Sequence, residues 1–182
     1  GTLMGVSPAN GMRAECFCHD CRAAELYTKQ PDPAPGGVQV YQTVPDRIRF
    51  DDGADQLAVF SLSDKGLLQW HAKCCGAILF KTARNPKLAF ASFRTDRLDD
   101  DTALGPIRAR AFVRKANSKR GHDGGLTFLF GFARRAISRL ITGQWKNTPF
   151  FDAEGQPVRD IELVPQSERT HIYPKATEPS GT

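Results

Sequence analysis

The sequence predicts a mainly β (α+β) fold, in which antiparallel β-sheets precede a C-terminal amphipathic helix. Sixteen glycines and twelve prolines among 182 residues place turns throughout the chain, which suits short strands better than a helical bundle. Turn residues separate six short extended runs that we expect to be strands, at 38–43, 47–50, 57–62, 67–71, 77–82 and 88–93. Two more strands are expected at 13–17 and 107–115, a loop at 116–125 and the long helix at 126–141.

The composition is that of a folded chain with enough apolar residues for a core. Hydrophobic residues make up 40% and charged residues 25% of it, and the mean hydropathy is −0.41. This balance argues against disorder throughout the chain. No apolar run reaches the roughly 18 residues that a membrane-spanning helix needs. The first residues contain neither the basic nor the apolar segment of a secretory signal, so we expect a cytoplasmic protein.

The net charge of +5 is mild, but the basic residues are unevenly distributed. The segment at 107–141 is strongly basic, and it is either a solvated face or a surface that attracts an anionic ligand, a membrane or nucleic acid. Nucleic acid is weakly supported, because no aromatic residues are interleaved with the arginines on a strand face. Between residues 107 and 141 one acid, Asp123, stands against Arg108, Arg110, Arg114, Lys115, Lys119, Arg120, Arg134, Arg135 and Arg139.

All five cysteines fall in two tight groups, which is poor material for a disulfide framework and typical of metal ligation. Cys16, Cys18 and Cys21 lie within six residues, and a tight turn can direct three sulfurs at one zinc ion. The alternatives are buried apolar cysteines or a redox dithiol. A fourth ligand would come from a remote cysteine, making the site structural, or the position stays open to a thiol, water or substrate.

The second group, Cys74 and Cys75, is a doublet. Adjacent residues share a metal only in a sharply turned loop, which Gly76 would permit. One of the two is therefore a candidate fourth zinc ligand, and the other a packed thiol. His19, inside the first group, is expected to be an exposed or supporting imidazole rather than a ligand, because neighbouring turn residues cannot all reach one ion.

The expected helix at 126–141 has a wide apolar stripe. We predict that it packs through Phe130, Ile137 and Leu140 and leaves Arg135 and Arg139 in solvent. A stripe of this width needs cover from the β domain or a second subunit, so a homodimer is one expectation, and a membrane or partner element is the alternative.

Three segments are expected along the chain. Residues 1–115 would form a zinc-binding β-rich domain, and 116–165 a helical C-terminal extension packed on it. The polar segment at 166–182 would be a flexible tail.

The cysteine pattern resembles the glutathione-dependent formaldehyde-activating family, which includes centromere protein V. The resemblance rests on Cys16-x-Cys18-x-x-Cys21-Arg22 and on Cys75-Gly76 followed by an apolar strand at 78–80. A bacterial branch of the family is most similar, because it shares the cysteine doublet, the segment at 104–110 and the Pro-Phe-Phe-Asp sequence at 149–152.

This resemblance implies an Mss4-like fold with two zinc sites. The knuckle formed by Cys16, Cys18 and Cys21 would be the site of glutathione thiol chemistry. The other, structural site of the family uses an earlier Cys-x-Cys and a late Cys-x-x-Cys. Here no Cys-x-Cys precedes Cys16, and Ala72 stands at the first late cysteine, so we expect that site to be absent or incomplete.

Two functions are consistent with these patterns. The first, implied by the resemblance, is a zinc-dependent carbon–sulfur lyase acting on an adduct of glutathione or another small thiol. Arginines would hold the thiol's carboxylates, and His19 or Asp20 would carry protons. The second is a non-catalytic zinc module that binds an anionic partner through its basic segment. The candidate carboxylate-binding arginines are Arg22, Arg108, Arg110 and Arg114.

Overall fold

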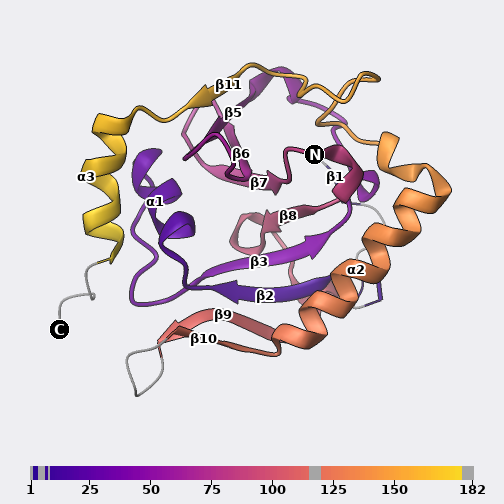
Figure 1. Ribbon diagram of the computed structural model, residues 1–182, viewed down its shortest axis with the longest axis horizontal. Helices are drawn as coiled ribbons and strands as arrows, with labels where there is room; N and C mark the ends of the chain where they lie inside the picture. The colour runs from indigo at the N-terminus through magenta and orange to yellow at the C-terminus, as the bar shows by residue number, and fades with distance from the viewer. Residues whose placement is uncertain (1, 4–6, 8, 115–119, 178–182) are drawn as a thin grey trace.

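A nine-stranded mixed sheet forms the body of the protein (Figure 1). The structure is a computed structural model that describes residues 2–3, 7, 9–114 and 120–177. The strand order is β10-β9-β2-β3-β8-β7-β6-β5-β11, and a separate pair joins β1 to β4. The strands are β1 Thr2–Leu3, β2 Met12–Cys16, β3 Val38–Thr43, β4 Ile48–Arg49, β5 Leu57–Ser61, β6 Leu68–Ala72, β7 Ile78–Thr82, β8 Ala91–Arg94, β9 Ala109–Arg114, β10 Arg120–Asp123 and β11 Ile161–Leu163.

The mainly β prediction is confirmed at the level of class, and the sheet is mixed rather than purely antiparallel. β2 pairs with β9 in parallel, and β5 pairs with β11 in parallel, whereas the other neighbours are antiparallel. Both parallel partners arrive late in the chain, after long connections. Local turn signals predict hairpins but not pairings of this kind, because the partner strand is distant in sequence.

The segment expected as a separate extension, 116–165, contributes to both edges of the sheet. β10 lies in a region expected to be a loop, yet it pairs with β9 as a hairpin. β11 closes the opposite edge beside β5. β10 was missed because its sequence, Arg-Gly-His-Asp, has no apolar residue to alternate, and β11 because its alternation, Ile-Glu-Leu, is only three residues long. Residues 115–119, part of the expected strand and loop, lie outside the described residues.

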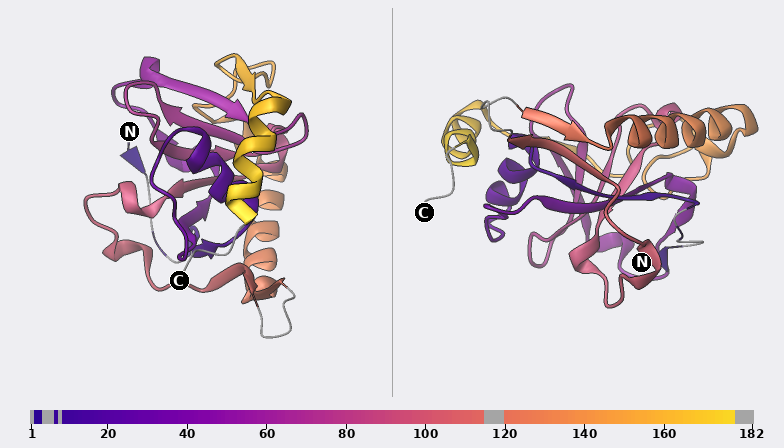
Figure 2. Two further views of the ribbon diagram at one scale, coloured as in Figure 1. Left: turned by 90° about the vertical axis from the view of Figure 1, so that its left-hand side faces the viewer. Right: turned by 90° about the horizontal axis from the view of Figure 1, so that it is seen from below.

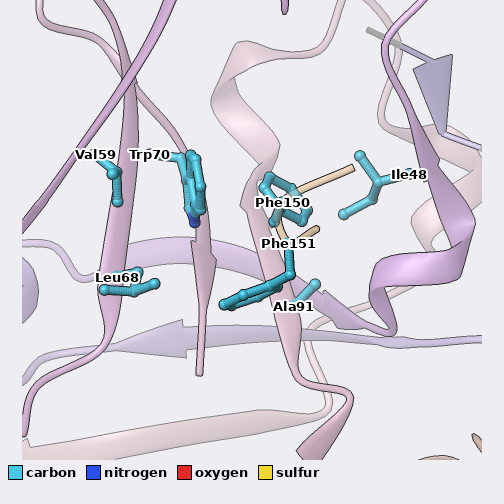
Figure 3. Packing of buried hydrophobic residues seen from close by; sticks show 7 residues of the cluster. All are labelled: Ile48, Val59, Leu68, Trp70, Ala91, Phe150 and Phe151. Atoms are coloured by element: carbon cyan, nitrogen blue, oxygen red, sulfur yellow. The ribbon is translucent and has the colours of Figure 1, made fainter. Parts of the chain in front are cut away.

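Two apolar clusters cover opposite faces of the sheet, because successive side chains of a strand alternate. Val59 of β5 belongs to one cluster, and its neighbour Phe60 to the other. In Figure 3, Phe150 and Phe151, which follow the long helix, lie with Trp70 over one face. The Trp70 indole NH donates to the Thr82 hydroxyl at 2.9 Å, so its buried polar group is satisfied.

The opposite face is covered by α1 (His19–Tyr27) and α3 (Gln166–Thr177), which lie side by side (Figures 1 and 2). α3 occupies most of the segment expected as a flexible tail. Its Ile172 and Tyr173 pack against the cluster around Ala23 and Ala24 of α1. The structure thus has a helix at 166–177 where the sequence suggested a flexible tail, and Tyr173 and Arg169 add hydrogen bonds to Asp20 and to the Leu62 carbonyl. Residues 178–182 lie outside the described residues.

A buried ion pair holds α1 against the sheet. Glu25 of α1 is 1% exposed and pairs with Arg94 of β8, which also donates to Asp96 at 2.7 Å. Ala23 and Ala24 are fully buried, and their small side chains let the helix approach the strands closely. The buried Glu25 carboxylate is shielded from water, so it depends on Arg94 for compensation of its charge, while Arg94 has Asp96 as a second partner.

The long helix, α2 (Gly125–Thr142), is rotated relative to the prediction. Phe130, Ile137 and Leu140, expected in the core, are 71%, 56% and 50% exposed. Arg135, expected in solvent, is 6% exposed and donates to the Gln42 side chain. Arg139 pairs with Asp46 at 2.9 Å, and its side chain is only 15% exposed. The prediction of the packed face was therefore wrong.

The physical reason is that the surface under α2 is polar in its middle. Gln42 and Asp46 offer buried or partly buried oxygens there, and Arg135 and Arg139 bind them. The apolar contacts of the inner face come from Phe128, against a cluster around Met12, and from Phe132, whose ring lies 5.7 Å from that of Phe90. No helix in the described part of the chain is long and apolar enough to cross a membrane.

Arg94→Met should destabilise the protein by roughly 3–5 kcal/mol, because Glu25 would keep a buried charge without its main partner. The control is Arg49→Met. Arg49 pairs with Asp51 at 2.7 Å, but both side chains are about half exposed, so its loss should cost less than about 1 kcal/mol. Urea unfolding of the two variants measures the difference. Equal losses would contradict the anchoring role of the buried pair.

The orientation of α2 makes a second prediction about stability. Arg135→Ala should cost about 1–3 kcal/mol, because it leaves the buried Gln42 oxygen without a donor. Phe130→Ala and the exposed neighbour Arg134→Ala should each change stability by less than about 0.5 kcal/mol. Thermal unfolding of the three variants tests this. A large loss for Phe130→Ala with none for Arg135→Ala would restore the opposite orientation.

Candidate metal centre

Three cysteines meet where β2 passes into α1. Cys16 is the last residue of β2, held between β3 and β9 through its pairing with Val38 and Ala111. Cys18 is the N-cap of α1, and its sulfur accepts the backbone NH of Cys21 at 3.2 Å. This is a capping interaction with sulfur in place of the usual oxygen. The local sequence thus turns the chain so that Cys21, in the first helical turn, faces back toward Cys16.

The sulfur atoms of Cys16, Cys18 and Cys21 all lie within 4.8 Å of one another and could hold a metal ion. Sulfurs bound tetrahedrally to zinc at about 2.3 Å lie about 3.8 Å apart, so only a small closure is needed. Three soft thiolate donors suit zinc better than magnesium or calcium. The donor set therefore fits the predicted ligation, and the group supplies three of four tetrahedral positions.

A lysine from the sheet lies against this group. The Lys81 ammonium donates to the Cys21 sulfur at 3.1 Å, and the side chain is 4% exposed. Burial disfavours its charge, but the negative Cys21 sulfur outweighs that cost and raises the pKa of Lys81. Sequence reasoning missed this residue. The available signal was a lone charged residue within the apolar run Ile78–Thr82.

Without a metal, one negative charge is concentrated on Cys21. Hydrogen bonds from the Cys16 and Cys18 thiols, with the Lys81 ammonium, hold the pKa of Cys21 well below its usual value. The pKa of Cys16 is raised by its hydrogen bonds to the other two thiols and by burial. The pKa of Cys18 is raised to about 12. The hydrogen bond from Cys16 lowers this pKa, but the Cys21 sulfur and burial raise it by more. A divalent cation would relieve this competition because its binding favours the thiolate form of all three cysteines, and the Lys81 ammonium would balance the one negative charge that remains.

His19 lies outside the group of three sulfurs, as the sequence indicated. Its ring contacts the Arg120 guanidinium, which also donates to the Phe17 carbonyl at 3.1 Å. Burial, with Arg120 adding to it, lowers the pKa of His19. Asp20 accepts the Tyr173 hydroxyl at 2.8 Å. Both residues therefore have partners from other elements.

The doublet Cys74 and Cys75 lies at the opposite end of α1. Both residues are exposed in the turn between β6 and β7, where Gly76 has the positive φ of 72° that the sharp turn requires. The Cys75 carbonyl accepts from Gln30, just beyond the C-terminus of α1, at 2.8 Å. A nine-residue helix is about 13 Å long. In the described part of the chain, the doublet is not brought to the sulfur group, and metal ligation by it stays a prediction.

The candidate arginines are unevenly placed. Arg22 makes two 2.6 Å hydrogen bonds to Asp32, and Arg110 pairs with Glu15 at 3.1 Å. Arg108 and Arg114 are exposed. A mostly apolar cavity of about 910 Å³ adjoins the sulfur group and includes Arg110, Lys81, Cys16 and Cys21 in its lining.

The fold and this site define an α+β protein with a mainly β mixed sheet and a three-cysteine group that could hold a metal ion. Residues 1–162 match a protein family described as "Family of unknown function (DUF6151)". Because the match covers most of the chain, the protein belongs to this family. A comparison with curated proteins gave no match.

Zinc content separates the two cysteine groups. The parent should bind about one zinc ion per chain, and Cys18→Ser should lose most of it, because two thiolates and a hydroxyl make a much weaker site. Cys74→Ser and Cys75→Ser should retain zinc, since the doublet lies at the other end of α1. Elemental analysis after dialysis of reduced protein decides. Loss of zinc in a doublet variant would identify that cysteine as the fourth ligand.

Proposed function

We propose that the protein is a zinc-dependent carbon–sulfur lyase that acts on the adduct of a thiol and an aldehyde. The observation that carries the proposal is the group of three sulfurs beside a cavity, with a buried lysine on one of them. The resemblance of the cysteine pattern to glutathione-dependent formaldehyde-activating enzymes supports it, and an Mss4-like fold is part of the same proposal.

The chemistry requires no oxidant or reductant. In an adduct RS–CH(OH)R′, the carbon–sulfur bond breaks and its electron pair stays on sulfur. The hydroxyl proton passes to the sulfur, and the thiol and aldehyde leave; the reverse reaction forms the adduct. Bound zinc supplies the Lewis acid that makes a thiol in its open position ionise near neutral pH.

The chain's own residues divide the remaining tasks. Cys16, Cys18 and Cys21 would hold the metal. Lys81, in hydrogen-bonding contact with the Cys21 sulfur, would stabilise negative charge on sulfur at the inner end of the cavity. Arg110, which pairs with Glu15 at 3.1 Å, lies in the cavity lining and would exchange that partner for an anionic substituent, whereas Arg22 is held by Asp32 and does not line the cavity.

A second function is a non-catalytic metal module whose basic strands bind an anionic partner. The exposed Arg114 of β9 and Arg120 of β10, with the exposed Arg108 just before β9, favour it. This function needs no open metal position, and it leaves the cavity and Lys81 without a role.

The test is the rate of adduct exchange in zinc-loaded protein. Formaldehyde and a thiol form the adduct reversibly, and ¹³C exchange spectroscopy measures the rate. The parent should accelerate exchange, and Cys18→Ser should not. Lys81→Met should keep its zinc but lose about 10²-fold in rate. Lys146→Met, at an exposed lysine that follows the C-terminal end of α2 and does not line the cavity, is the control. Exchange no faster than with free zinc would reject the lyase and leave the binding module.

A further inference from the structure

The cavity beside the sulfur group has the size and lining of a binding site for an apolar molecule. Its volume of about 910 Å³ lies at the upper end of what ligand pockets enclose. It lies between the sheet and the first turns of α2. Small side chains form its floor on β2 and β9, and larger apolar ones its walls. They include Ala14, Ala109, Ala111, Phe90, Phe112 and Phe128.

The first residues of α2 cover one side of the cavity, and the start of this helix lies very close to the sheet. Gly124, before the first turn, has a φ of +68°, and a Cβ there would lie 2.2 Å from the Arg108 carbonyl. Only glycine allows this close approach of the helix start to β9. Phe128 then packs on the cluster around Met12 and Ala109. The start of α2 is thus fixed to the sheet, while the small residues of β2 and β9 leave space beneath the helix.

Apolar atoms make up most of the lining. Cys16, Cys21 and the buried Lys81 form the group at which a sulfur or an electrophilic carbon would react, and further polar residues of the lining include Glu15, Gln42, Arg110, His122 and Asp123. Leu67, 41% exposed, and Leu126, 72% exposed, are apolar residues of the lining that reach the surface. Glutathione carries two carboxylates, an ammonium and two amides, which a mostly apolar lining suits less well than it suits a hydrocarbon; Arg110, which could bind a carboxylate, is paired with Glu15 at 3.1 Å.

We propose that the cavity binds the apolar substituent of the thiol adduct, so that the substrate is an adduct of an alkyl or aryl thiol rather than of glutathione. This proposal rests on the proposed lyase function, whose reaction it leaves unchanged. The same carbon–sulfur bond breaks, and the hydroxyl proton passes to the sulfur of the apolar thiol. The hydrocarbon occupies the space under α2.

Binding is tested with N-phenyl-1-naphthylamine, an uncharged apolar fluorophore, in protein with and without zinc. Saturable binding is expected in both forms. Ala111→Phe, which fills the cavity, should weaken binding at least about tenfold, and octanethiol, but not glutathione, should displace the probe. Ala103→Phe, at an exposed position on another surface, is the control. If Ala111→Phe does not fold, Leu67→Asp, at a partly exposed lining position, takes its place. Absence of saturable binding, or binding unaffected by these changes, overturns the proposal.

The exchange assay separates the two proposals. Rates that rise from ethanethiol to octanethiol support the apolar substrate. Equal or better rates with glutathione reject it and leave the lyase in place. Probe binding without any accelerated exchange rejects the lyase and with it the substrate proposal, and leaves only an apolar binding site.

A different observation concerns the outer face of α2. Six large apolar side chains on this one helix are at least half exposed: Leu126, Leu129, Phe130, Ile137, Leu140 and Ile141. At 100° per residue they form one continuous stripe along the side opposite Arg135 and Arg139. We call these six residues the outer stripe. A stripe of this kind is typical of a helix that lies in a membrane interface or under a partner.

The charges around the outer stripe favour a membrane interface over a second copy of the chain as the surface that covers it. From Gly124 to Phe151 the sequence contains no acidic residue. Arg134 and Lys146 are exposed, and Lys87 lies over the Trp145 ring at 5.7 Å. A second copy that docked through the segment 124–151 would bring the same cations against these. Anionic lipid headgroups complement both the cations and the apolar stripe.

We further propose that the outer stripe docks the protein on an anionic lipid surface. Vesicles of phosphatidylcholine with phosphatidylglycerol should co-sediment the protein, and pure phosphatidylcholine vesicles should bind at least about tenfold less. Ile137→Asp with Ile141→Asp should abolish binding without unfolding the protein, because both positions are exposed. Val158→Asp, 40% exposed and outside the stripe, is the control. Absence of vesicle binding, or a dimer in sedimentation velocity that the double variant dissociates, overturns the proposal.

Discussion

The buried contact between α1 and the sheet is the constraint on which the metal centre depends. Glu25 pairs with Arg94 in the interior, and the fully buried Ala23 and Ala24 bring the helix close to the strands. Because α1 is rigid, this attachment also sets the position of its first turn. Cys21 consequently meets both Cys16 at the end of β2 and Lys81 of β7. A helix held further out would keep the cysteine turn but lose the lysine.

Lys81 couples the sulfur group to the sheet in return. A buried ammonium is costly unless an opposite charge lies near it, and in the described part of the chain its hydrogen bond goes to the Cys21 sulfur. The same contact that favours an ionised Cys21 therefore makes the lysine tolerable in a strand whose first three residues are apolar. The Glu25 carboxylate is also close enough to the Lys81 ammonium for their charges to interact, so the Glu25–Arg94 pair is electrostatically coupled to the sulfur group.

α2 shows that an amphipathic pattern defines two faces without saying which one is inside. The helix was expected to bury its apolar face, which is the usual outcome for a helix on a sheet. Here Gln42 and Asp46 lie beneath it, and each binds an arginine. The apolar packing is left to Phe128 and Phe132 on the inner face. The outer stripe is thus a consequence of what the sheet offers, and it is what makes this face available to a partner.

The sequence by itself determined the local parts of this protein. Turn residues predicted most strands of the central sheet. The spacing of Cys16, Cys18 and Cys21 predicted one sulfur group, because a tight turn brings closely spaced residues together and residues three apart at the start of a helix are neighbours in space. Tertiary structure alone decided the rest. It brought Lys81 to Cys21 from 60 residues away, left Cys74 and Cys75 at the far end of α1, and turned the arginines of α2 inward. These outcomes depend on which strands become neighbours and which polar groups they expose, and neither is encoded in any short segment of the chain.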